Sequence, residues 1–214
     1  MKLKQTIGGG KRHGYSVAAH HEAGHAVAGS LLGNPWSTIE IDGSAGRVSL
    51  GRGELLESSH KGFWVAQRWN ALGDDVKHIV ADIAAMAGPA AEARYSRQSM
   101  FYVSQFGGGV RDYESILVVK KMEATRLARL VVNRCWPLVG EIARWLLEEG
   151  VLMRDECFAK IEDAPEFQIA SAELLPLINA YLISAGFKPI PRPDYSQLAA
   201  LDCAPACAGL TTVF

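Results

Sequence analysis

Two histidines four residues apart constrain this chain more than any other feature of its sequence. The segment HHEAGHAVAG, residues 20–29, carries His21 and His25 on either side of Glu22. It belongs to an Ala- and Val-rich stretch that we expect to form a helix over residues 16–32. Residues four apart lie on the same face of a helix, one turn apart. Both imidazoles can therefore face the same metal ion.

The glutamate between them suggests a chemical role for such a metal ion. Glu22 lies about 100 degrees around the helix from His21, so it can point beside the ion rather than at it. A zinc hydrolase uses two imidazole ligands and a carboxylate that accepts the proton of the attacking water. We expect Glu22 to be this general base and then to protonate the leaving amine. Gly24 leaves room for another backbone segment to come close.

An ordinary structural role for the two histidines is the alternative. His21, His25, Ala28 and Leu32 fall on one stripe of the expected helix, and this stripe should face the core. Two unpaired imidazoles would be costly in a core, so metal ligation explains them better than a hydrogen-bonded structural pair. His20 faces elsewhere on the helix, and we expect it near the surface or beside the site, not as a ligand.

A catalytic zinc site needs a third protein ligand and an open fourth position. Spacing alone does not choose among four carboxylates: Asp82, Glu92, Asp112 and Glu114. Asp112 follows three consecutive glycines and opens a helix, where Asp is also a common cap. Glu92 lies on another expected helix, where a solvated position or a pair with a neighbouring arginine is the alternative.

Composition bounds the class of protein. The 214 residues are 49% hydrophobic, which suits one domain, or one domain with an extension. A net charge of -1 gives no sign of nucleic-acid binding. The N-terminus has no apolar signal region, and no apolar run reaches the ~18 residues of a membrane span, so we expect a cytoplasmic protein. The four cysteines are few and scattered, which is typical of reduced thiols.

Helical and alternating periodicity predict an α+β fold that is mostly helical. Two short strands around a Gly-Ser turn are expected within 37–51. Helices are predicted over residues 75–96, 112–134 and 137–149, with a short last one over 154–161. We expect Gly88-Pro89 to kink or interrupt the first of these helices.

The chain divides into three parts by composition and periodicity. We expect a flexible N-terminus over 1–14, a folded domain over 15–162, and a partly irregular C-terminal extension over 163–214.

Several stretches resemble one known family in the same order along the chain. HHEAGHAVAG resembles the zinc helix of the FtsH-type metallopeptidase domain, the proteolytic part of membrane-anchored AAA proteases. TIEIDGSAGRVSL is similar to the strand pair that follows that helix, and ADIAAMAGPAAEARY to its helix with Gly-[Arg/Pro]-Ala-Ala-Glu. GGGVRDYESI is similar to the segment that supplies the third ligand, and ARWLLEEGVLMRDECFAKI to the closing helices. The resemblance covers residues 15–162.

The resemblance implies a zincin-like peptidase domain with a small sheet beside the HExxH helix. It implies Zn²⁺ held by His21, His25 and Asp112, with Glu22 as the base. Glu92 would lie near the site, where it supports a ligand or the fold, or serves as an alternative ligand.

An edge strand near the zinc binds the substrate backbone in such folds. We expect strand 46–50 to take this role, with Gly46, Val48 and Leu50 as candidates. The resemblance therefore implies an endopeptidase that acts on polypeptides.

No stretch of the sequence is similar to the AAA ATPase module or the membrane anchor of the family, so we expect the protein to lack both. We therefore expect it to cleave only flexible or unfolded polypeptides, to use an ATPase on another chain, or to act on one specific protein target. A non-catalytic zinc-containing module that binds peptides or partner proteins is the alternative. Glu22 favours the enzyme, because a degenerate module often loses the base. Monomer, dimer and larger oligomer stay open.

Overall fold

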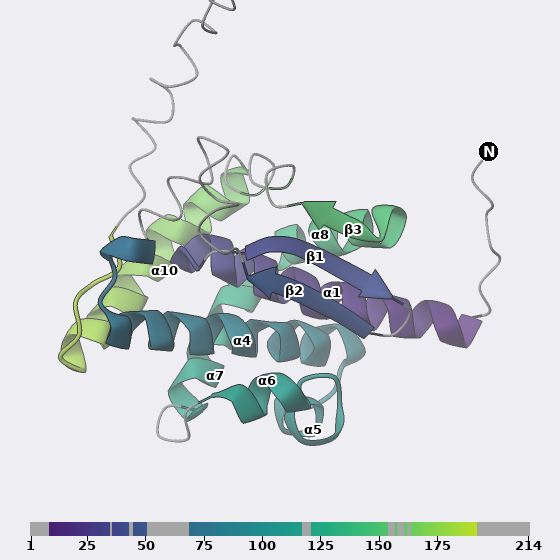
Figure 1. The fold of residues 1–214 in the computed structure, drawn as a ribbon, viewed down its shortest axis with the longest axis horizontal. Helices are drawn as coiled ribbons and strands as arrows, with labels where there is room; N and C mark the ends of the chain where they lie inside the picture. Colours follow the sequence, from purple (N-terminus) through teal and green to yellow (C-terminus); the bar gives the residue numbers. More distant parts are fainter. Residues whose placement is uncertain are drawn as a thin grey trace, which may run out of the picture.

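The computed structural model describes residues 9–34, 36–42, 45–50, 69–116, 121–153, 157, 161 and 164–191. Within these ranges the protein is mostly helical and has one small antiparallel sheet, which is the expected α+β class. Helices α1 (Gly9–Leu32) and α4 (Asp74–Ser96) lie side by side at the centre, with the sheet packed on α1 (Figure 1).

Small residues let α1 and α4 approach closely. A side chain at Gly24 would collide with the Ala87 carbonyl of α4 and come within 2.8 Å of the Ala91 Cβ. The room that the sequence predicted at Gly24 is therefore filled by the α4 backbone. This contact fixes the α1 face that carries the two histidines against α4.

The start of α1 differs from the prediction. The helix begins at Gly9, not at Ser16, so residues 9–14 are helical where we expected a flexible segment. The Gly run and Gly14 lower helix propensity, but the packed helix that follows extends through them. Residues 1–8 lie outside the described residues.

Helix α4 runs without interruption through Gly88 and Pro89, so of the predicted kink or interruption, the interruption does not occur. Proline lacks an N–H, so the helical hydrogen bond to the Ala85 carbonyl cannot form. Both residues are buried, and tertiary contacts hold the helix on both sides of this position.

The sheet contains β1 (Trp36–Asp42), β2 (Ala45–Leu50) and β3 (Val151–Met153) in the order β2-β1-β3. The two predicted strands are confirmed as β1 and β2, which pair antiparallel with Ile39 opposite Val48. The predicted turn between them falls on residues outside the described part. Sequence analysis missed β3, which has only three residues.

The region after α4 is divided more finely than predicted. Two short helices follow it, α5 (Met100–Phe106) and α6 (Val110–Ser115), before α7 (Lys121–Arg134). The single predicted helix over 112–134 is therefore wrong, because α6 ends at Ser115 and Ile116 has an extended backbone. Helix α8 (Trp136–Glu149) matches its prediction. The predicted helix over 154–161 falls mostly outside the described residues.

The last described helix, α10 (Pro165–Ser184), was not predicted. It packs against α1, α7 and α8, and its buried residues join the same core as those helices. It is also the one described helix long and apolar enough to cross a membrane, with a window of mean hydropathy 1.2 that is 39% buried. We expected no apolar run of about 18 residues, and the sequence analysis did not identify α10 as apolar enough to pass this test.

Candidate metal centre

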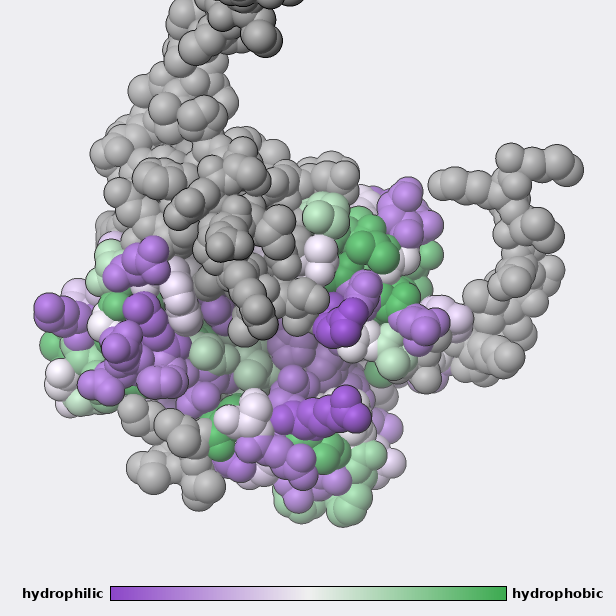
Figure 2. All heavy atoms as spheres, viewed as in Figure 1, coloured by the Kyte–Doolittle hydropathy of each residue, from purple (hydrophilic) through white to green (hydrophobic). Residues whose placement is uncertain are grey.

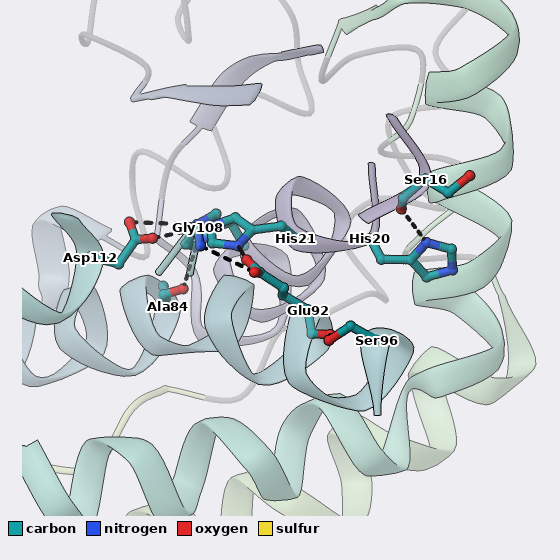
Figure 3. Close-up of polar contacts among 9 residues, drawn as sticks. Ser16, His20, His21, Ala84, Glu92, Ser96, Gly108 and Asp112 are labelled. Carbon is teal, nitrogen blue, oxygen red and sulfur yellow. Dashed lines mark hydrogen bonds and ion pairs between the residues drawn. The ribbon is translucent and has the colours of Figure 1, made fainter. Parts of the chain in front are cut away.

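Three side chains from two helices converge beside the α1–α4 contact. His21 and His25 come from α1, and Asp112 comes from the first turn of α6. One ligand atom from each lies within 4.8 Å of the others. Nε2 of His21 is 3.0 Å from one Asp112 oxygen (Figure 3). Nε2 of His25 is 3.7 Å from the other Asp112 oxygen. The two histidines and the aspartate expected from the resemblance therefore lie together.

Hydrogen bonds at the opposite ring nitrogens orient the two imidazoles. His21 donates from Nδ1 to the Glu92 carboxylate at 2.8 Å, and His25 donates from Nδ1 to the Ala84 carbonyl at 2.9 Å. In a neutral imidazole the other nitrogen then carries a lone pair. Both lone pairs face Asp112. Two neutral imidazole nitrogens and one carboxylate, each able to bind a metal ion, therefore point toward one small space.

The two imidazole nitrogens and the Asp112 carboxylate are best satisfied by a cation between them. A proton on His21 Nε2 would link that ring to Asp112, but it would leave the lone pair of His25 facing the second oxygen. A divalent ion among the three atoms satisfies all of them, and imidazole nitrogen with carboxylate oxygen suits Zn²⁺ and several other first-row metals. The residues therefore fit a metal ion.

The electrostatics of the group agree with this preference for positive charge. The pKa of His21 is raised to about 10, since burial, which opposes protonation, is outweighed by hydrogen bonds to Asp112 and Glu92 and by nearby carboxylates. The pKa of Asp112 is lowered: burial would raise it, but the His21 hydrogen bond and both histidines outweigh burial. A metal ion would take the place of the proton on His21.

Glu92 connects the site to the loop before α6. One of its oxygens accepts the His21 Nδ1–H, and the other accepts the Gly108 backbone N–H at 3.1 Å. The carboxylate is buried in α4. Glu92 therefore holds both a histidine and the loop that leads to Asp112, and it lies on the far side of the His21 ring from Asp112.

Glu22 lies in the same pocket but outside the ligand group. It is buried, with 5% exposure, and it lines a pocket of 1020 Å³ together with His21, His25 and Asp112. Burial raises the pKa of Glu22, although the two histidines oppose the rise. A carboxylate beside the metal ligands with a raised pKa is suited to accepting and releasing a proton.

The remaining carboxylate candidates take no part in the ligand group. Asp82 lines the same pocket, whereas Glu114 is exposed and does not line it. His20 also lies apart: its ring stacks on Tyr95 at 3.9 Å between centroids, and its Nδ1–H donates to the Ser16 carbonyl at 2.7 Å. The expectation that His20 is no ligand agrees with this position.

Strand β2 lies directly over Glu22. A side chain at Gly46 would come within 2.6 Å of a Glu22 oxygen, so only glycine fits there without a shift. Among the described strands, β2 is at one edge of the sheet and pairs only with β1. The backbone of β2 includes Val48 and Leu50, whose side chains lie outside the described part.

Sequence reasoning missed the backbone partners of the site. The Ala84 carbonyl and the Gly108 N–H orient His25 and Glu92, and any residue could supply them. It also missed His78 and Arg111, which line the pocket. Hydrophilic side chains gather over α6 and over the first turns of α4 (Figure 2).

The chain matches no protein-family model, and no curated protein matches its sequence. The chemistry of the centre must therefore be inferred from its residues.

Proposed function

We propose that the protein is a zinc-dependent endopeptidase of the zincin-like, FtsH-type class. One observation carries the proposal: a buried Glu22 lies beside the converging ligand atoms of His21, His25 and Asp112. When bound, a zinc ion would polarise the scissile carbonyl and acidify the attacking water. One pocket would then contain every residue that this type of peptide hydrolysis needs: His21, Glu22, His25 and Asp112.

Each residue has a defined task. Asp112 and the Nε2 atoms of His21 and His25 hold the ion. Glu22 accepts a proton from the attacking water and delivers it to the amine of the leaving peptide. Glu92 fixes the His21 ring, so that Nε2 and not Nδ1 faces the ion.

The position of β2 supports a polypeptide as substrate. An extended peptide pairing with this edge strand would run past Glu22, because Gly46 packs on it. This pairing uses hydrogen bonds to the substrate backbone. The substrate must therefore be flexible or unfolded, so that its backbone is extended and free to pair. A cytoplasmic location, and dependence on an ATPase of another chain or on a single target protein, belong to the same proposal.

Cleavage of unfolded casein by the wild type and by Glu22→Gln tests the proposal, with zinc measured on both. We expect equal zinc and a loss of rate of about 10²–10⁴-fold in the variant, because the general base is gone while the ligands stay. Cleavage that persists in Glu22→Gln at an unchanged rate would overturn the assignment of the base. Zinc in both proteins with cleavage in neither would favour the alternative, a non-catalytic module that binds peptides.

A further inference from the structure

A second pocket, of 540 Å³, lies between α5, α6 and α7, and we call it the groove. It shares no lining residue with the pocket of the metal centre. Its apolar lining includes Met100, Phe101, Met122 and Leu130. Phe101 is 71% exposed and Met122 is 88% exposed. Large apolar side chains gathered at a concave surface are typical of an interaction site.

The apolar surface continues beyond the pocket along α5. Phe106, also 71% exposed, packs edge-on against Phe101 at 6.5 Å between ring centroids, and Tyr102 is 47% exposed. Green, hydrophobic side chains lie among purple ones over α5 and α6 in Figure 2. Exposed aromatic side chains along a helix beside an apolar pocket suit the apolar face of an amphipathic segment.

The charged groups at this pocket all have the same sign. Lys121, Arg126 and Arg129 line it, and no acidic residue of the described part does so. Arg126 pairs with Glu123, and Lys121 lies 4.2 Å above the Tyr113 ring. Arg129 is exposed and has no carboxylate within ion-pair distance among the described residues. The rim is therefore complementary to an acidic ligand.

We infer that this groove binds an acidic, amphipathic segment of a partner protein. Apolar side chains of the segment would enter between Phe101 and Met122, while its carboxylates would face Lys121 and Arg129. The inference does not rest on the proposed peptidase activity. It does place the partner beside the metal centre, because Tyr113 of the groove follows Asp112 on α6.

Selection from a random 16-residue peptide display library tests the inference. The target is the full chain with Glu22→Gln, which prevents cleavage of bound peptides if the protein is a peptidase. We expect enriched peptides to combine Asp or Glu with aromatic or aliphatic residues at helical spacing. No enrichment, or enrichment of neutral or basic peptides, would overturn the inference.

Matched variants then locate the binding surface for one enriched peptide. Arg129→Glu should raise its Kd by about tenfold or more, because the rim charge is reversed. Lys188→Glu makes the same charge change at an exposed site outside the groove and should leave the Kd within about twofold.

The apolar contact has its own pair of variants. Phe101→Ser should weaken binding by about tenfold, whereas Ile183→Ser, at a side chain 60% exposed on α10, should not. Equal effects within either pair would mean that binding occurs elsewhere, and would overturn the inference. Because the readout is binding, a failure of the proposed hydrolysis leaves this result unaffected.

Discussion

Hydrogen bonds at two Nδ1 atoms decide what the histidines of this site can do. His21 donates to Glu92, and His25 donates to the Ala84 carbonyl. Both rings therefore present Nε2 toward Asp112, where a metal ion can bind. A histidine pair with the same sequence spacing but free rotation would lose this preorganisation, and with it part of its metal affinity.

Glu92→Gln tests how much this orientation contributes. The carboxylate accepts from both His21 Nδ1–H and Gly108 N–H, but an amide has only one oxygen and would turn an N–H toward one of these donors. We expect zinc affinity to fall about 10–100-fold, measured by competition with a chelator. Glu114→Gln, at an exposed position on α6, is the control and should keep wild-type affinity.

The site depends on close contact between helices α1 and α4. Gly88 of α4 faces both histidines: a side chain there would collide with the His25 ring and reach within 2.8 Å of His21 Cδ2. Glycine is otherwise unfavourable inside a helix by about 1 kcal/mol. Gly88 therefore does not stabilise the helix; it leaves the space that the two histidine rings occupy.

Gly88→Ala should accordingly reduce zinc binding, because the added methyl group displaces His25. Gly140→Ala is the matched control, since nothing lies within 4 Å of a side chain at that position of α8. The control should keep its zinc and gain about 0.5–1 kcal/mol of stability. Metal analysis and thermal unfolding of both variants check this, and full zinc occupancy in Gly88→Ala would contradict it.

The parts of the fold that could be predicted are those with a strong local pattern. Helices α4 and α8 and the β1–β2 pair follow their periodicity, and H-E-x-x-H points to the α1 ligands. The choice of Asp112 over Asp82 depends on how α6 packs on α4, which spacing alone does not encode. The resemblance, not the residue pattern, selected it.

Other elements were missed for identifiable physical reasons. Strand β3 is too short to show alternation and forms because β1 offers it a partner. Helix α10 is apolar on most of its surface, so it lacks the amphipathic pattern that reveals a helix. Pro176 lies inside α10, where a proline ordinarily disrupts a helix, yet tertiary packing holds the helix together.

The molecule as a whole includes α10, although the sequence placed residues 163–214 in an extension. Its inner face shares one core with α1, α7 and α8, where Phe167, Leu174 and Ile178 are almost fully buried. Burial of this kind couples the stability of α10 to that of the helices around the metal centre.

Two leucines on α10 provide a direct comparison. Leu174 is 2% exposed and Leu177 is 55% exposed. Leu174→Ala should cost about 2–5 kcal/mol in the free energy of unfolding, and Leu177→Ala less than about 0.5 kcal/mol. Denaturant unfolding measures both. Equal effects would mean that α10 is not packed on the core as described.

Metal content tests the central claim most directly. The chain would be purified without a metal-binding tag or chelator, given excess zinc, dialysed, and analysed by mass spectrometry beside Asp112→Ala and the exposed control Glu114→Ala. We predict about one zinc per chain in the wild type and the control, and a clear loss in Asp112→Ala, because two helix-spaced histidines need the third ligand. A folded wild-type protein that retains no zinc would contradict the account.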